Sequence, residues 1–265
     1  MKQVDLIQGT PEWHAHRAQH WNASEAPAMM GCSPYETRNE LLQRIATGIK
    51  PEVDAATQQR YDDGHAFEAK ARTLAEAILG EALFPDVGVE GKYSASFDGL
   101  TMDESVAFEH KTLNNELRFA FADIGTMAPN YRESLGAGAL LPLHYRVQME
   151  HQLMVSGAEK CLFMASKWDR NSGELLEEHH CWYGPNPKLR AEIIAGWKQF
   201  EEDLAAFVPP ERAAPVRVTP VASLPALMIQ VQGSIALVDN LTAFGDALNA
   251  YVAKINRTPK TDQDF

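Results

Sequence analysis

The sequence predicts an α/β protein, in which helical segments and β-strands alternate along the chain. Residues 96–112 have the pattern of a β-hairpin, and residues 160–183 contain two further strand-like segments joined by a polar turn. Two long segments with apolar residues at helical spacing, 57–79 and 187–207, precede and follow these strands. This order of elements is typical of a sheet covered by helices.

Composition indicates one sizeable core with a small appendage. The chain has 265 residues, of which 45% are hydrophobic, and this is enough to bury such a core. No apolar run approaches about eighteen residues, and no signal-peptide pattern is present. The three cysteines are far apart and odd in number, so neither a disulfide framework nor a zinc or iron–sulfur site is indicated. We therefore expect a cytoplasmic protein that does not contact membranes.

The net charge of −12 argues against a general nucleic-acid coat protein, because non-specific affinity for DNA comes mainly from Lys and Arg contacts to phosphates. The charge is still compatible with an enzyme that gathers its basic residues in one channel or uses metals as local positive charge. A ring that encloses DNA is also compatible with it. Net charge alone does not decide whether the chain acts on DNA.

Start and stop signals predict four helical segments in the N-terminal part. Thr10 and Thr37 precede two of these segments and are typical N-cap residues. Gly31 and Gly80 follow two others and are typical helix stops. The four predicted segments cover 11–17, 22–30, 38–47 and 57–79.

The middle of the chain predicts a β-hairpin. Gly99 and the polar cluster 103–105 supply turn residues. Along residues 106–112, apolar and polar residues alternate well enough to predict a strand. The preceding strand includes the residues around Asp98. Two adjacent antiparallel strands are therefore expected here.

Three side chains of this hairpin are expected to converge. Residues two apart on a strand point to the same side, so Glu109 and Lys111 share a face, with Asp98 on the neighbouring strand. Carboxylates of this kind suit Mg²⁺ or Mn²⁺, and a lysine beside them can orient or deprotonate an attacking water. A surface strand with a cross-strand charge pair is the alternative interpretation of the Glu-x-Lys triplet.

The C-terminal half predicts further helices and strands before a proline-rich linker. Residues 114–143 are rich in Gly and Pro, and we expect them to be irregular, with short helices and a mobile loop. The elements predicted next are a helix over 144–155, strands over 160–168 and 174–183, and a helix over 187–207. The apolar face of this last helix is predicted to contain Ile193, Ile194, Trp197, Phe200 and Leu204. The linker is predicted at 209–220, followed by a small α/β appendage over 221–265.

Five blocks of sequence follow one another in a characteristic order. They are 13–17 with 22–25, then 30–35, 64–72, the hairpin with its Glu-x-Lys triplet, and 145–152. These blocks resemble the lambda-exonuclease-like (YqaJ-type) phage recombination exonucleases, a branch of the PD-(D/E)xK nuclease superfamily. Phe97 stands where the superfamily motif usually has proline. The resemblance implies a restriction-endonuclease-like nuclease domain over 1–208, with a central mixed β-sheet flanked by helices.

The resemblance also implies a role for each matching residue. Asp98, Glu109, Glu68 and the main-chain carbonyl of His110 would bind metal, with two Mg²⁺ ions expected and Mn²⁺ as a substitute. Lys111 would act on the attacking water. The residues that match the family's pocket for a 5′-phosphate are Arg17, Ser24, Ser96 and Gln148. Such a pocket is chemically sensible, because an arginine fork with hydroxyl and amide donors suits a phosphate dianion.

His65 lies one helical turn from Glu68 and is a further candidate at the metal site, although a lone helical histidine is more often structural. The last residues, 261–265, resemble the beginning of a helical tail in longer relatives. This similarity indicates a truncated or naturally shorter form.

By resemblance, the protein would be a Mg²⁺-dependent, ATP-independent 5′-to-3′ exonuclease on linear double-stranded DNA. It would release mononucleotides and leave 3′ single-stranded overhangs for a phage single-strand-annealing protein. The resemblance further implies a homotrimeric ring and expression from a phage or prophage in a bacterial host. Two alternatives remain: a structure-specific or restriction-type endonuclease, and a non-catalytic module that binds DNA ends or proteins. The joint presence of Asp98, Glu109 and Lys111 argues against the non-catalytic module.

Overall fold

The computed structural model of the protein describes residues 1–49, 55–132 and 136–208. These residues belong to one unit, Met1–Pro209. The predicted linker, 209–220, and the predicted appendage, 221–265, lie outside the described residues. Within the described part, no helix combines the length and the apolar character needed to cross a bilayer.

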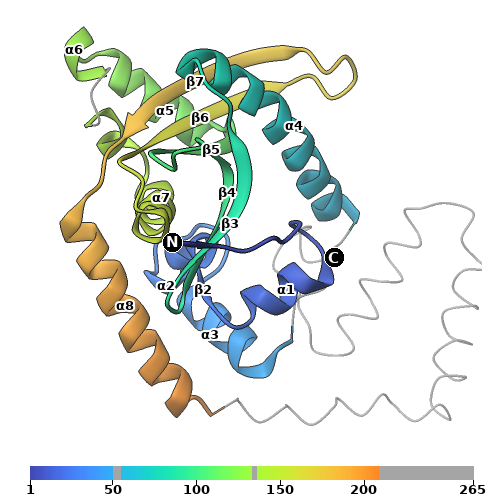
Figure 1. Cartoon of the computed structure of the whole chain (residues 1–265), viewed down its shortest axis with the longest axis vertical. Coiled ribbons are helices and arrows are strands. Elements are labelled where there is room, and N and C mark those ends of the chain that lie inside the picture. The colour runs from blue at the N-terminus through green and yellow to red at the C-terminus, as the bar shows by residue number, and fades with distance from the viewer. Residues whose placement is uncertain (50–54, 133–135, 209–265) are drawn as a thin grey trace, which may run out of the picture. The chain divides into compact units, whose positions relative to one another are not determined.

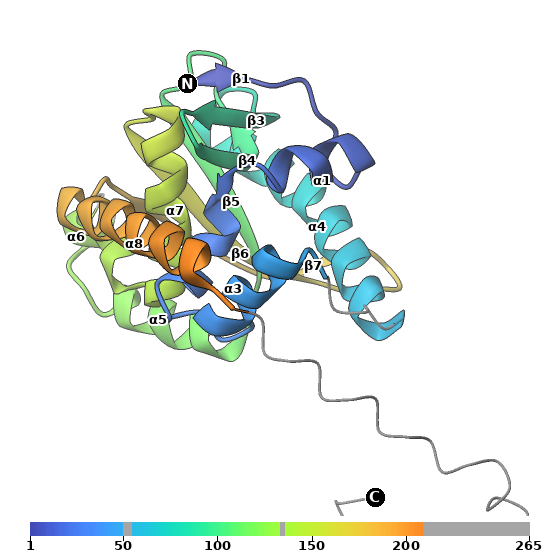
Figure 2. The same ribbon diagram turned by 90° about the horizontal axis from the view of Figure 1, so that it is seen from below.

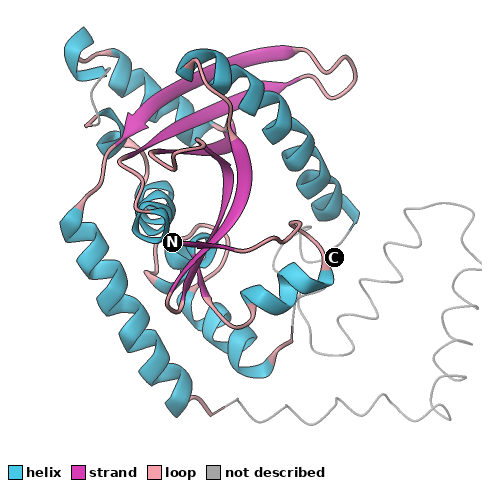
Figure 3. Ribbon diagram, in the orientation of Figure 1, coloured by secondary structure: helices cyan, strands magenta, loops and turns pink. Residues whose placement is uncertain are grey.

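A mixed sheet of seven strands forms the centre of the described unit (Figure 3). The strands are β1 (Lys2–Gln3), β2 (Trp21–Asn22), β3 (Phe84–Glu90), β4 (Tyr93–Leu100), β5 (Val106–Thr112), β6 (Lys160–Trp168) and β7 (Leu175–Tyr183). Their order is β1-β3-β4-β5-β6-β7, and β2 pairs with β4. The pairs β5 with β6 and β2 with β4 are parallel, whereas the others are antiparallel. The predicted α/β class with a central mixed sheet is therefore confirmed.

Helices surround this sheet (Figure 1). They are α1 (Pro11–Arg17), η1 (Ala23–Glu25), α2 (Ala26–Met29), α3 (Arg38–Thr47), α4 (Ala55–Leu79), α5 (Asn115–Gly125), α6 (Pro129–Arg132), η2 (Ala137–Leu140), α7 (Leu143–Ser156) and α8 (Pro187–Ala206). The predicted caps are present: the Thr10 hydroxyl accepts from the Trp13 N–H, and Thr37 forms a capping box with Glu40. Gly80 follows α4 with a φ of 75°, a conformation that glycine adopts easily.

Helices α4 and α7 cover opposite faces of the sheet (Figures 1 and 2). One apolar cluster joins α4 to strands β5 and β6 through Ala71, Ala75, Phe108, Leu162 and Met164. A larger cluster joins α5 and α7 to the other face and includes Ala107, Phe121, Met149, Leu153 and Phe163. Neighbouring residues of β5 therefore face different helices, as expected for a strand buried on both sides.

A third apolar cluster packs against α7 on the side that faces away from the sheet. It connects α2, α3 and α8 with Val147 of α7. Within it, the ring of the fully buried Trp197 stacks on Trp21 with 5.0 Å between centroids. Helix α7 is thus packed between the sheet and α8, and this packing sets which of its side chains point toward β5.

The segment 114–143 is more regular than we expected. It contains α5, an 11-residue helix, in addition to short helices. The Asn114 side chain caps α5 by accepting from the Leu117 N–H at 2.8 Å. Four apolar residues of α5, namely Leu117, Ala120, Phe121 and Ile124, are buried. An amphipathic helix was therefore overlooked because of the glycines and prolines that follow it.

Two further expectations were wrong in detail. Gly99 lies within β4 instead of in the turn, and a Cβ atom at this position would come within 2.9 Å of Leu83 Cβ. The glycine is needed there for close packing.

Ile194 is 42% exposed, since the buried stripe of α8 follows Leu189, Ile193, Trp197 and Phe200. Strand β3 was not predicted.

Candidate active site

Strands β4 and β5 bring the predicted catalytic residues to neighbouring positions. They pair antiparallel through Gly99 with Phe108 and Leu100 with Ala107. The connecting turn is closed by Asp103, whose carboxylate accepts from the Thr101 hydroxyl at 2.7 Å and from the Ser105 N–H at 3.0 Å. Asp98 on β4 therefore lies beside the segment of β5 that carries Glu109 and Lys111.

Glu109 is the most enclosed of the acidic residues at this site, with a side chain only 2% exposed. The Lys111 ammonium forms an ion pair with its Oε1 atom. Two glutamines of α7 also donate to this carboxylate: Gln148 Nε2 lies 2.6 Å from Oε1, and Gln152 Nε2 lies 2.6 Å from Oε2. The buried negative charge is thus compensated by one cation and two amide donors.

Asp98 and Lys111 have strongly shifted pKa values. Burial raises the pKa of Asp98 well above its ordinary value, and the nearby Glu109 and Glu68 carboxylates raise it further, against Lys111 and the His110 N–H. This N–H donates to Asp98 Oδ2 at 2.7 Å. For Lys111, burial opposes the charge, but Glu109 and Asp98 outweigh it and raise its pKa.

Glu68 approaches the same site from α4. It pairs with Arg72 one turn further along, with Glu68 Oε1 lying 2.9 Å from Arg72 Nη2. Arg72 Nε also donates to the main-chain oxygen of Asp98 at 2.6 Å. Arg72 therefore connects α4 to the strand that carries Asp98. The side chain of His65 lies outside the described residues, so its predicted role stays untested.

The donor set fits a divalent cation in part. Asp98, Glu109 and the main-chain carbonyl of His110 offer hard oxygen atoms of the kind that Mg²⁺ prefers. A cation between the carboxylates would also relieve the repulsion that contributes to the raised pKa of Asp98. Among the described residues, however, no three His, Cys, Asp or Glu side chains are arranged to hold a metal. The role of Glu68 as a further ligand stays a prediction.

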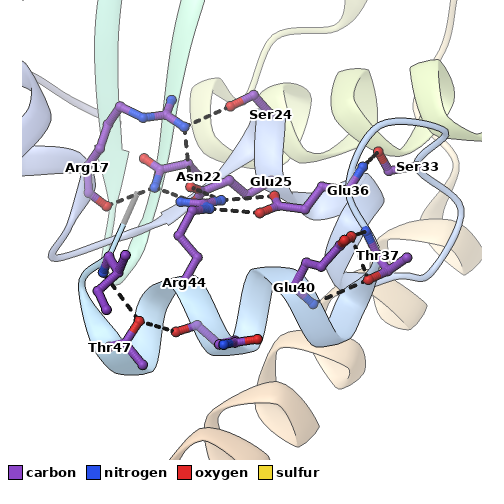
Figure 4. A network of polar contacts seen from close by, with 12 residues as sticks. Arg17, Asn22, Ser24, Glu25, Ser33, Glu36, Thr37, Glu40, Arg44 and Thr47 are labelled. Atoms are coloured by element: carbon purple, nitrogen blue, oxygen red, sulfur yellow. Dashed lines mark hydrogen bonds and ion pairs between the residues drawn. The ribbon is translucent and has the colours of Figure 1, made fainter. Parts of the chain in front are cut away.

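Arg17 and Ser24, two residues of the predicted phosphate pocket, are in direct contact (Figure 4). Arg17 Nη2 donates to Ser24 Oγ at 3.0 Å and lies 3.5 Å from Glu25 Oε1. Arg44 of α3 reaches the same Glu25 oxygen at 3.1 Å and also pairs with Glu36, with Nε 2.8 Å from Oε1. The structure thus adds two acids and a second arginine to the expected pair.

Burial and pairing act differently on the two arginines. Burial lowers the pKa of Arg17, and the Arg44 charge lowers it further, whereas Glu25 opposes both effects. For Arg44, the hydrogen bonds to Glu36 raise the pKa, despite burial, and Glu25 adds to this effect. Both guanidinium groups stay charged at neutral pH.

Ser96 and Gln148, the other two residues predicted for this pocket, have different neighbours. Ser96 Oγ accepts a hydrogen bond from Trp13 Nε1 at 3.1 Å, and the Arg17 guanidinium lies 4.7 Å from the centre of a Trp13 ring. Trp13 therefore links Ser96 to Arg17. Gln148 instead donates to Glu109, so it is placed at the acidic cluster.

Sequence reasoning missed Gln152 and Glu25 as site residues, and it did not anticipate the hydrogen bond from Trp13 to Ser96. Gln152 follows Gln148 by four positions, which places both on one helical face, and this spacing was the available signal. Glu25 belongs to the Asn-Ala-Ser-Glu block, but its contact with Arg17 depends on the fold of η1. Trp13 contributes a polar N–H in addition to its ring.

The mixed sheet, the flanking helices and the Asp98, Glu109 and Lys111 cluster define an α/β protein of the PD-(D/E)xK class. The chain belongs to the family of YqaJ-like viral recombinase domains, whose model matches residues 12–159. The match includes every candidate site residue discussed above. A comparison with curated protein sequences found no match.

Solved structures with a similar fold include an alkaline exonuclease from Laribacter hongkongensis. It shares 23% sequence identity with this chain, with coverage of 74% of this chain and 93% of the exonuclease, and the TM-score is 0.54. The same exonuclease in complex with dAMP gives 22% identity, the same coverage and the same TM-score. At this level of identity the similarity establishes the fold.

Proposed function

We propose that the chain is a metal-dependent DNA exonuclease that acts on the ends of linear double-stranded DNA without ATP. The observation that carries this proposal is the cluster of Asp98, Glu109 and Lys111 on two adjacent strands, in a domain of a viral recombinase family. The alkaline exonuclease with the similar fold supports the same class of activity. We further propose that the 5′-ended strand is degraded to mononucleotides, which leaves a 3′ single strand.

The chain's own residues provide a consistent arrangement for this reaction. Asp98, Glu109 and the His110 carbonyl would hold Mg²⁺, or Mn²⁺ as a substitute, with Glu68 completing a site for two ions. A metal held there would supply Lewis-acid chemistry, which would polarise the scissile phosphate and stabilise the leaving 3′-oxygen. Lys111 stays protonated beside Glu109 and orients the attacking water by donating a hydrogen bond.

The terminal 5′-phosphate would bind at Arg17 and Ser24. Arg17 offers a planar fork of donors, and Ser24 offers a hydroxyl 3.0 Å away. Ser96 lies next to this pair through Trp13, and Gln148 lies on the side of the acidic cluster. This order of groups would place a strand end at Arg17 and its first phosphodiester near Glu109. Selectivity then comes from the end of the duplex and not from base readout.

Incubation with linear and closed circular duplex DNA tests this proposal. With Mg²⁺, we expect loss of the linear duplex, release of mononucleotides and no change in the circle, and we expect EDTA to stop the reaction. Cleavage of the circle would instead identify an endonuclease. Binding to the ends of linear DNA without any cleavage would identify a module that only binds DNA.

We also propose a closed ring of three subunits, as the family resemblance implies. A ring keeps an acidic enzyme on DNA by topology, so weak phosphate contacts suffice. The segment 114–143 is a candidate for subunit contact, and Phe119 of α5 within it is 73% exposed. The remaining 3′ single strand would then bind a phage single-strand-annealing protein in the cytoplasm of a bacterial host.

Light scattering should therefore give the mass of three chains. As the salt concentration rises, the number of nucleotides removed per binding event should fall less steeply than the rate at which the enzyme loads onto DNA. Salt weakens the phosphate contacts needed for loading, but it does not open a ring that already encloses the duplex. A stable monomer at micromolar concentration that degrades long stretches without dissociating would contradict the ring.

A further inference from the structure

Helix α7 presents two glutamine amides to a single carboxylate. Gln148 and Gln152 are four residues apart, so both point from one face of the helix. Gln148 Nε2 donates to Glu109 Oε1, and Gln152 Nε2 donates to Glu109 Oε2, each at 2.6 Å. The two amides thus hold both carboxylate oxygens and leave little freedom to rotate the group.

Gln152 has the more specific environment of the two. Its side chain is fully buried, and its Nε2 atom donates both to Glu109 Oε2 and to the main-chain oxygen of Ser96 at 3.3 Å. A reversed amide would turn its oxygen toward both of these acceptors, so the observed orientation is determined. Within the described residues, Gln152 Oε1 is buried without a hydrogen-bond partner. The two hydrogen bonds donated by Nε2 thus offset the cost of leaving Oε1 buried without a partner.

Gln152 also connects two parts of the site. Glu109 belongs to the acidic cluster, whereas Ser96 accepts from Trp13, which in turn lies against Arg17. The amide of Gln152 is therefore a direct link between β4, which carries Ser96, and the carboxylate expected to bind metal. A shift of this amide would alter the position of Glu109 relative to Ser96.

We propose that Gln152 is a positioning residue that holds Glu109 in the orientation required for metal binding. This inference rests on the proposed function, because it assumes that Glu109 is a metal ligand. Hydrogen-bond partners of metal ligands commonly change metal affinity or activity by about 10- to 100-fold when they are removed. Gln152 fits this role because it touches the carboxylate and its side chain is fully buried.

The test compares the full-length wild type with Gln152→Met, which keeps a similar shape and removes the amide donors. Isothermal titration calorimetry of Mn²⁺ binding in the absence of DNA is the main measurement. We expect the dissociation constant to rise by about 10-fold or more. The nuclease rate should also need more metal for half-saturation, while the rate at saturating metal recovers most of the wild-type value.

Gln199→Met is the matched control, because Gln199 of α8 also donates to a carboxylate, Asp203 Oδ1, at 3.0 Å, but on the surface. It should leave metal binding unchanged. Thermal unfolding of each variant separates a metal effect from a stability effect, and Gln152→Leu provides a second variant if the methionine is not tolerated. Loss of folding in both variants would assign Gln152 to stability alone and overturn the proposal.

The outcomes separate this inference from the proposed function. If the wild type binds Mn²⁺ and Gln152→Met binds it equally well, the positioning role is wrong and the exonuclease proposal stands. If the wild type binds no metal and cleaves DNA in EDTA, the metal-dependent mechanism itself is wrong, together with the role of Gln152.

Discussion

Replacing Lys111 with alanine is expected to lower the turnover number by about 10²- to 10⁴-fold. The Lys111 ammonium contacts Glu109 and lies beside Asp98, where we expect the attacking water. A group that acts on the nucleophile contributes mainly in the transition state, so binding to DNA ends should stay close to that of the wild type. Single-turnover kinetics and an end-binding assay would measure the two quantities separately.

Two variants control for the loss of a positive charge. Lys167→Ala removes an exposed lysine from β6, the strand next to β5, and should leave turnover unchanged. Lys111→Arg retains the ion pair with Glu109 but has a different donor geometry, so we expect only partial activity. A Lys111→Ala enzyme with wild-type turnover would refute the assigned role.

Replacing Arg17 with alanine is expected to remove the preference for 5′-phosphorylated over 5′-hydroxyl ends. An arginine that pairs with a phosphate contributes about 1.5 to 3 kcal/mol, or roughly 10- to 150-fold in the rate ratio. The measurement is the ratio of kcat/KM for two duplexes that differ only in the terminal group.

The matched control for Arg17 is Arg38→Ala. Arg38 forms a partly exposed ion pair with Asp203 and is not one of the residues assigned to the phosphate pocket, so its removal should leave the preference intact. If the wild type does not distinguish the two ends, the assignment of Arg17 and Ser24 to phosphate binding is wrong.

The predictable parts of the fold are those encoded by local signals. Thr10, Thr37 and Gly80 mark helix ends through contacts within a few residues, and the structure has helix boundaries at these residues. Strand β3 was missed because Pro85 and Gly88 interrupt its pattern. Its place in the sheet follows from pairing with β4, including a register shift between Phe84 and Asp86. Such long-range pairing has no local signal.

The same distinction applies to the candidate site. Alternation along β5 was enough to predict that Glu109 and Lys111 share a face, because that relation depends only on strand geometry. The partners of Gln148 and Gln152 depend on how α7 is rotated about its axis. That rotation is set by packing between the sheet and α8, through residues such as Val147 and Trp197. The rotation of α7 therefore cannot be predicted from local patterns in a single sequence.

Arg17 and three charged residues of its network form an internally neutral group. Arg17 and Arg44 carry two positive charges, and Glu25 and Glu36 carry two negative charges within the same network (Figure 4). Such a group exerts little attraction on a distant polyanion, in agreement with the acidic character of the whole chain. An incoming phosphate would have to displace Glu25 from Arg17 at close range. If Arg17 binds a terminal phosphate as proposed, Glu25 would compete with that phosphate, and a ligand would need to fit the pocket and carry enough charge to replace it.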